Sequence, residues 1–153
     1  MALQVSIPID DDGFLRRECP SCMGQFKWHH GPVSEAAETA PSAEIHFCPL
    51  CGVSATVDLW WTQEQLEYAH GVAVPQFMNE FTDELRDAVR QPRDSFIQLS
   101  VETSDVADAP APLVEPNDME IVASPCHAYE PVKVPQKLRG PFFCLVCGAE
   151  FAV

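Results

Sequence analysis

Short β-prone stretches lie toward both ends of the chain, whereas helical spacing of apolar residues dominates its middle. We expect strands at 14–17, 26–29, 45–47 and 53–61 in the first part, and at 119–123, 131–134, 140–143 and 149–153 in the last. Short β-prone runs bounded by turn-forming residues are typical of small sheets built from hairpins. Residues 31–44 are rich in Pro, Ala, Ser and Glu and lack periodicity, so we expect an irregular loop there.

The middle of the chain predicts two helices. The first begins near Thr62, which can cap the first turn while Gln65 reaches back as its partner, and Gly71 is expected to end it. The second runs from Pro75 to Gln91, since proline suits a first helical turn and another proline follows directly. Its apolar residues form one stripe at helical spacing: Val74, Phe77, Met78, Phe81, Leu85, Ala88 and Val89. Acidic residues crowd the other side, which is either a solvated surface or a docking surface for a basic partner.

Six of the seven cysteines form three Cys-x-x-Cys pairs. The first two pairs are Cys19 with Cys22 and Cys48 with Cys51. A Cys-x-x-Cys turn places two sulfur atoms on one edge of a tetrahedron, and two such turns supply the four soft ligands that Zn²⁺ prefers. Backbone N–H groups in each turn can donate to the sulfur atoms and stabilise the thiolates. These cysteines therefore predict a first zinc site, against the alternatives of a redox dithiol or free structural thiols.

The third pair, Cys144 and Cys147, needs two further ligands to form a second zinc site. Cys126 supplies one, and the adjacent His127 is the obvious candidate for the other. Neighbouring side chains point to opposite faces of an extended strand, so both can bind one ion only if the chain turns tightly here. Glu130 or a residue from the first part of the chain is the alternative fourth ligand, and an open fourth position would instead indicate a catalytic site.

The segment Gly13-Phe14-Leu15-Arg16-Arg17-Glu18-Cys19-Pro20-Ser21-Cys22, followed by Phe26-Lys27-Trp28, resembles small bacterial zinc-ribbon proteins. Both cysteine-rich parts of the chain are similar to zinc ribbons. The C-terminal part departs from the four-cysteine pattern at Cys126 and His127, which leaves its ligand set open. Zinc ribbons occur in transcription factors, polymerase subunits, ribosomal proteins and assembly factors, so the resemblance implies a fold and a metal without selecting a function.

These patterns predict an α+β protein in which two small zinc-ribbon β modules flank a short helical segment. Residues 1–102 are expected to hold the N-terminal ribbon, two helices and a strand at 97–102. Residues 103–117 combine prolines with acidic residues, which predicts an extended linker. Residues 118–153 are expected to form the C-terminal ribbon-like module, and each module is expected to hold one zinc ion.

Charge and hydropathy narrow the possible partners and location. The chain carries 23 acidic and 9 basic residues, a net charge of −14, and the excess lies within residues 35–120. Such a chain repels a phosphate backbone at long range, which disfavours nucleic-acid binding. No run of 18 apolar residues occurs, so no membrane span is expected. The first dozen residues turn acidic and do not resemble a secretory signal, so we expect a cytoplasmic protein with reduced thiols.

The leading functional interpretation is a non-catalytic zinc-binding adaptor or regulatory protein that binds another protein. Trp28, Trp60 and Trp61 either supply aromatic area to an interface or pack in the core.

Two alternatives remain open. Nucleic-acid binding would use the basic residues near the two modules, namely Arg16, Arg17, Lys27, Lys133, Lys137 and Arg139. An enzyme would need an open zinc position in the C-terminal site or acid–base chemistry from the remaining histidines, His29, His30, His46 and His70.

Overall fold

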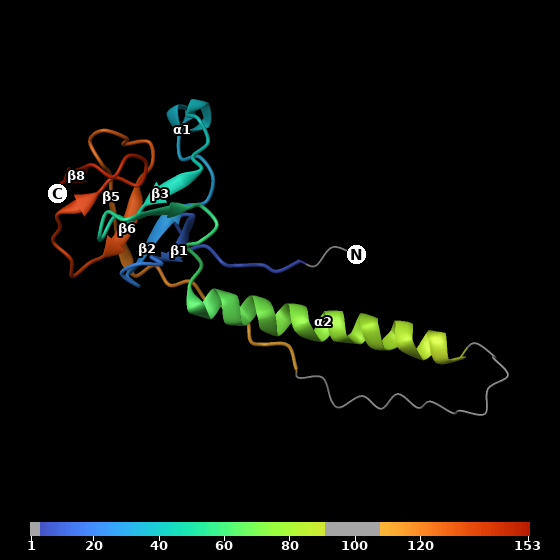
Figure 1. Cartoon of the computed structure of the whole chain (residues 1–153). Coiled ribbons are helices and arrows are strands. Elements are labelled where there is room, and N and C mark those ends of the chain that lie inside the picture. The colour runs from blue at the N-terminus through green and yellow to red at the C-terminus, as the bar shows by residue number, and fades with distance from the viewer. Residues whose placement is uncertain (1–3, 91–107) are drawn as a thin grey trace. The chain divides into compact units, whose positions relative to one another are not determined.

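The computed structural model describes residues 4–90 and 108–153 (Figure 1). The described residues fall into two compact units. Residues 7–65 and 113–153 form the first, which we call the ribbon unit, and residues 4–6, 66–90 and 108–112 form the second, the helical unit. The strand expected at 97–102 and the linker residues 103–107 lie outside the described residues.

The ribbon unit contains a strand at each of the eight places where a β-prone stretch predicts one; four strands are shorter than expected, two are longer and two have the expected length. Their bounds are β1 Phe14–Glu18, β2 Gln25–His29, β3 Ile45–Phe47, β4 Ser54–Thr56, β5 Met119–Val122, β6 Val132–Pro135, β7 Phe142–Phe143 and β8 Glu150–Phe151. The loop expected at 31–44 includes a short helix, α1 (Glu35–Thr39), because the Ser34 hydroxyl accepts a hydrogen bond from the Ala37 N–H at 3.3 Å.

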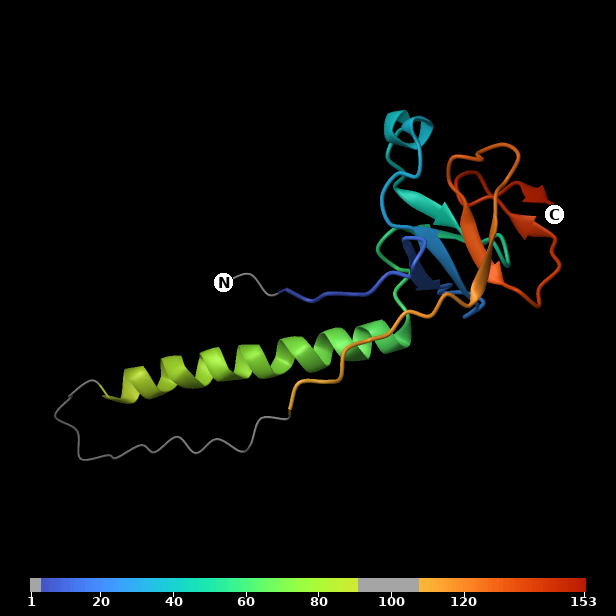
Figure 2. The same cartoon turned by 180° about the vertical axis from the view of Figure 1, so that it is seen from behind.

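The first and last parts of the chain share one sheet. Its strand order is β1-β2-β6-β5, and every neighbouring pair is antiparallel. In Figures 1 and 2 the blue strands β1 and β2 lie beside the orange strands β5 and β6. Two separate modules flanking a helical segment are therefore not confirmed. Pairing β2 with β6 removes two exposed strand edges, which explains why the parts join.

The two halves of the ribbon unit repeat one arrangement. Each half has a longer hairpin, β1–β2 or β5–β6, and a separate short hairpin, β3–β4 or β7–β8. The strands β2 and β6 meet at the middle of the sheet, where Trp28 is opposite Val132. Side chains on this face of β2 and β6 pack with side chains from both short hairpins and the loops beside them in one apolar core. Its large members are Phe26, Trp60, Val132, Val134, Phe142, Leu145 and Phe151. Trp60 is fully buried, so it belongs to the core rather than to an exposed interface.

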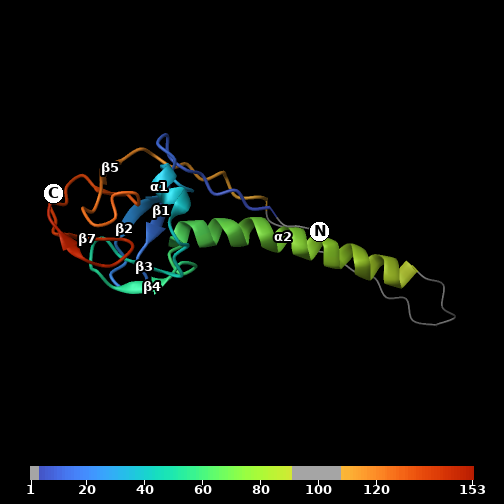
Figure 3. The same cartoon turned by 90° about the horizontal axis from the view of Figure 1, so that it is seen from above.

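A single long helix, α2 (Gln63–Arg90), replaces the two helices expected in the middle of the chain (Figure 3). The predicted cap is present, because the Gln65 N–H donates to the Thr62 hydroxyl and the Gln65 side chain accepts from the Thr62 N–H, both at 3.1 Å. The prediction of a break between Gly71 and Pro75 was wrong, because the helix runs through both residues. Pro75 deprives the helix of one hydrogen bond to the Gly71 carbonyl, but the helix formers on either side continue it. Gly71 gives room to Pro110, whose ring lies 3.0 Å from where a Cβ would be.

Candidate metal centres

Cys19, Cys22, Cys48 and Cys51 come together at the ends of β1 and β3 with their sulfur atoms within 4.8 Å of one another. The Sγ–Sγ distance is 3.7 Å between Cys19 and Cys51 and 3.9 Å between Cys22 and Cys48. Zn–S bonds of about 2.3 Å in a tetrahedron require sulfur atoms about 3.8 Å apart. The four thiols therefore already have the spacing of a zinc tetrahedron.

Backbone N–H groups surround the sulfur atoms of this first site. The Cys19 sulfur accepts from the N–H groups of Ser21 and Cys22, and the Cys48 sulfur accepts from Leu50, each at 3.4 Å. Burial acts to raise the pKa of the Cys19 thiol, but these hydrogen bonds outweigh it and lower that pKa. Burial raises the pKa of Cys48, and the neighbouring Cys19 raises it further, so the N–H groups of Leu50 and Cys51 do not offset the effect. A bound Zn²⁺ would supply the positive charge that holds all four thiols as thiolates.

Cys126, His127, Cys144 and Cys147 form the second group, again with ligand atoms within 4.8 Å of one another. The Cys126 and Cys147 sulfur atoms are 3.5 Å apart, and the Cys144 sulfur is 3.4 Å from Nδ1 of His127. Tetrahedral zinc with Zn–S and Zn–N bonds of ordinary length places S and N about 3.6 Å apart. The eight ligand residues thus fit two zinc sites, one with four sulfur ligands and one with three sulfur ligands and a nitrogen.

His127 reaches the second site because the chain is not extended there. The Ser124 hydroxyl accepts a hydrogen bond from the His127 N–H at 3.3 Å, and the His127 carbonyl accepts from the Glu130 N–H at 3.0 Å. This turn places the Cys126 and His127 side chains on the same side. Glu130, the alternative ligand, lies outside the group and lines a neighbouring pocket instead.

Ser124 also contacts the second site directly, which the sequence did not indicate. Its hydroxyl donates to the Cys144 sulfur at 3.1 Å. Burial acts to raise the pKa of the Cys144 thiol, but this bond and the N–H groups of Cys147 and Val146 lower it to about 6. Cys144 is therefore a ready anionic ligand at neutral pH.

The two sites are joined by a reciprocal pair of hydrogen bonds between their loops. The Phe47 N–H, just before Cys48, donates to the Leu145 carbonyl at 2.9 Å. The Phe143 N–H, just before Cys144, donates to the Pro49 carbonyl at 3.0 Å. Each phenylalanine ring also lies against the glycine that follows the other loop's last cysteine.

Those glycines have positive φ and no room for a side chain. Gly52 has φ +75° and Gly148 has φ +73°. A Cβ on Gly52 would lie 3.0 Å from the Phe143 ring, and one on Gly148 would lie 2.5 Å from the Phe47 ring. The sequence signal for this contact is the recurring order Phe-Cys-x-x-Cys-Gly at 47–52 and 143–148. One loop therefore packs on the other in the same way twice.

Most of the basic residues beside the two sites are engaged inside the protein. Lys27 and Lys133 are fully buried and paired with acidic side chains, and Arg16 bonds to Glu115 and Asp118. Arg17 is also buried, between the rings of Trp28 and Trp61, each 4.4 Å from the guanidinium carbon. Its burial without a nearby acid lowers its pKa to about 10.

Among the candidate histidines, His46 packs on Trp28 with ring centroids 4.8 Å apart. Burial lowers its pKa, so the ring is neutral at neutral pH.

None of the described helices is long and apolar enough to cross a bilayer. Compared with known proteins, the chain matches no family model, no curated protein and no solved structure.

Proposed function

We propose that this protein is a non-catalytic adaptor in which two zinc ions hold the ribbon unit together and α2 binds another protein. The observation that carries the proposal is the apolar stripe of α2, which is exposed to solvent. Its residues keep large exposed fractions of their surface, from 38% to 68%: Val74, Phe77, Met78, Phe81, Leu85 and Val89. Contiguous apolar surface of this kind is typical of protein interaction sites.

The charge of α2 indicates the chemistry of the partner. The helix carries six acidic and two basic residues, a net charge of −4. At 100° per residue, Glu80, Glu84 and Asp87 follow one flank of the apolar stripe. The surface therefore suits a partner with an apolar groove bordered by Lys or Arg. A second copy of this acidic chain is a poorer match because like charges would meet.

The geometry of the ribbon unit favours a structural role for the metal. Each group of ligands is complete without water, and zinc with four protein ligands serves as a cross-link rather than as a source of reactive hydroxide. Lys27, Lys133 and Arg17 are buried, so they offer little surface to a phosphate backbone. Both points support an adaptor over an enzyme or a nucleic-acid-binding protein.

The proposal is tested with the full zinc-loaded chain as bait in extract from the native host. Candidate partners are then purified and their binding to the chain is measured by calorimetry. The variant F77S/F81S removes both aromatic rings of the stripe. We expect it to weaken binding more than tenfold, since buried aromatic anchors often contribute over 2 kcal/mol, roughly thirtyfold.

The matched control is Q76S/N79S, which changes two exposed polar residues of the same helix away from the stripe. It should bind the partner as the wild type does. Equal binding by F77S/F81S and the wild type would refute the role of the stripe. Sedimentation of the chain alone tests whether a second copy binds the stripe instead. If the wild type is a dimer and F77S/F81S is a monomer, the stripe is a self-association surface.

A further inference from the structure

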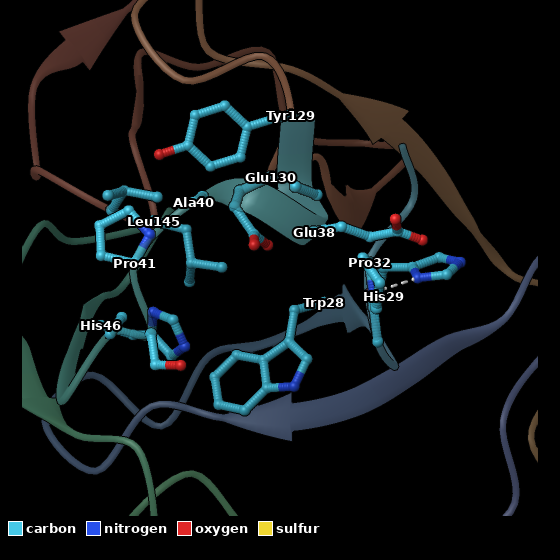
Figure 4. Close-up of a pocket in the computed structure, with 15 residues that line it drawn as sticks. Trp28, His29, Pro32, Glu38, Ala40, Pro41, His46, Tyr129, Glu130 and Leu145 are labelled. Atoms are coloured by element: carbon cyan, nitrogen blue, oxygen red, sulfur yellow. Dashed lines mark hydrogen bonds between the residues drawn. The ribbon is translucent and has the colours of Figure 1, made fainter. Parts of the chain in front are cut away.

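The ribbon unit contains a pocket that neither zinc site uses. Its volume is about 390 Å³, within the range of sites that hold a small ligand or an inserted side chain. The walls come from β2, from the loop that includes α1, from His46 on β3, and from residues 129–130 and 145–146 beside the second zinc site. Figure 4 shows these segments surrounding a hollow above Trp28.

The walls combine an apolar part with two carboxylates. Trp28, Pro41 and Leu145 supply the apolar part, and Glu38 and Glu130 are its acidic residues. No Lys or Arg occurs among the residues that line the pocket. Elsewhere in the same unit, buried carboxylates such as Asp10 are paired with lysines, whereas the basic residues that line this pocket are two histidines, His29 and His46.

Glu130 is the group that most needs a partner. Figure 4 shows its carboxylate directed into the hollow. It forms no hydrogen bond or ion pair with any described side chain, although it is partly buried. Burial raises the pKa of Glu130, against a smaller opposing effect of His29. A partly desolvated carboxylate without a donor gains most from a cationic ligand that brings N–H groups.

We propose that this pocket binds an alkyl-ammonium or alkyl-guanidinium group, with the alkyl chain against Trp28, Pro41 and Leu145 and the cation at Glu130. Lysine and arginine side chains have this chemistry, and so do free aliphatic amines. The inference concerns a different surface from the apolar stripe of α2. Failure of either proposal therefore leaves the other standing.

The test follows the Trp28 indole and the Leu145 and Val146 amide signals by ¹H–¹⁵N NMR in the zinc-loaded full chain. The probes are n-butylammonium, n-butylguanidinium and, as the uncharged control, n-butanol. We expect saturable shifts with the two cations and much smaller shifts with butanol. Butanol binding as tightly as the cations, or no saturable shift at about 10 mM cation, would overturn the proposal.

The variant E130Q keeps the shape of the side chain and removes its charge. It should weaken cation binding about tenfold, as expected for the loss of a charge-assisted hydrogen bond. The matched control E120Q removes one charge from an exposed position on β5, outside the pocket, and should bind within about twofold of the wild type. Equal binding by E130Q and E120Q would refute the role of Glu130.

Zinc content and the amide spectrum check that E130Q is folded. If E130Q loses its zinc, E130A takes its place, and unchanged cation binding by folded E130A then refutes the proposal. A capped Gly-Gly-Lys-Gly-Gly peptide distinguishes the two sources of the cation. Binding of the peptide much more tightly than butylammonium assigns the pocket to a partner's side chain, and the reverse order assigns it to a free amine.

Discussion

Lys27 and Lys133 face each other in register across β2 and β6, and both donate to the same oxygen of Asp10, at 3.0 and 2.8 Å. Two buried like charges at this spacing would repel each other strongly without the shared anion. Three further acidic residues form ion pairs with these lysines and balance their charge: Asp12, Glu115 and Asp118. Asp10 therefore links the strands of the first half of the ribbon unit to those of the second.

Replacing Asp10 by Asn should lower the free energy of unfolding of the zinc-loaded protein by about 3 kcal/mol, the cost typical of breaking a buried ion pair. Urea unfolding followed by tryptophan fluorescence measures the change. The neighbouring D11N is the matched control, because Asp11 is exposed, and it should change stability by less than about 0.5 kcal/mol. Equal stabilities of D10N and D11N would show that the shared carboxylate does not hold the halves together.

The same carboxyl predicts a definite pH dependence. Burial acts to raise the pKa of Asp10, but hydrogen bonds from Lys133, the Phe14 N–H and Lys27 lower it from 3.8 to about 2. Because the folded pKa lies below the unfolded one, this stabilisation is complete above about pH 4 and is lost as the pH falls through 2. The difference in unfolding free energy between wild type and D10N should thus stay constant from pH 8 to 5. A difference that shrinks within this range would contradict the assignment.

The glycine after the last cysteine of each loop offers a sharper test of packing. G148A combines strain at φ +73° with a Cβ only 2.5 Å from the Phe47 ring, and should destabilise the protein by about 2–4 kcal/mol. G31A is the matched control, since Gly31 has φ +86° but no atom within 4 Å of where its Cβ would be, so only the strain of about 1 kcal/mol remains. Unfolding curves that give G148A and G31A the same loss of stability would mean that the Phe47 ring moves aside at little cost.

The metal ligands could be predicted from the sequence because their geometry is local. A Cys-x-x-Cys turn fixes two sulfur atoms by itself, so Cys48 and Cys51 indicate half a site wherever the chain carries them. His127 followed from the need for an eighth ligand, and the turn at Ser124 that makes it possible rests on side-chain hydrogen bonds. The cap of α2 was likewise local, because Thr62 and Gln65 bond to each other.

The arrangement of the halves could not be predicted because it depends on contacts between residues far apart in the chain. Lys27 and Lys133 look like surface residues in sequence, and only the pairing of β2 with β6 explains their burial. Pro75 led to a wrong helix boundary, since its local cost is outweighed by the residues on both sides. Predicting the contact between the two loops would have required a comparison of the two segments with the order Phe-Cys-x-x-Cys-Gly.

The hydrogen bonds between the loops predict that the two zinc sites are coupled. Wild type should bind two zinc ions per chain, and H127A should lower the affinity of the second site at least about tenfold. Emptying that site frees the loop that holds the Leu145 carbonyl and the Phe143 N–H, so the first site should also weaken, about fivefold.

Zinc release into a graded series of chelator concentrations measures both affinities, and cobalt substitution distinguishes the four-sulfur site from the site with a nitrogen ligand by its absorption spectrum. H30A is the matched control, because His30 is exposed and lies outside both ligand groups, and it should keep both zinc ions with unchanged affinities. An unchanged first site in H127A would mean that the loops share a core but bind their metals independently. A weakened first site would make the ribbon unit a single cooperative structure with two metal centres.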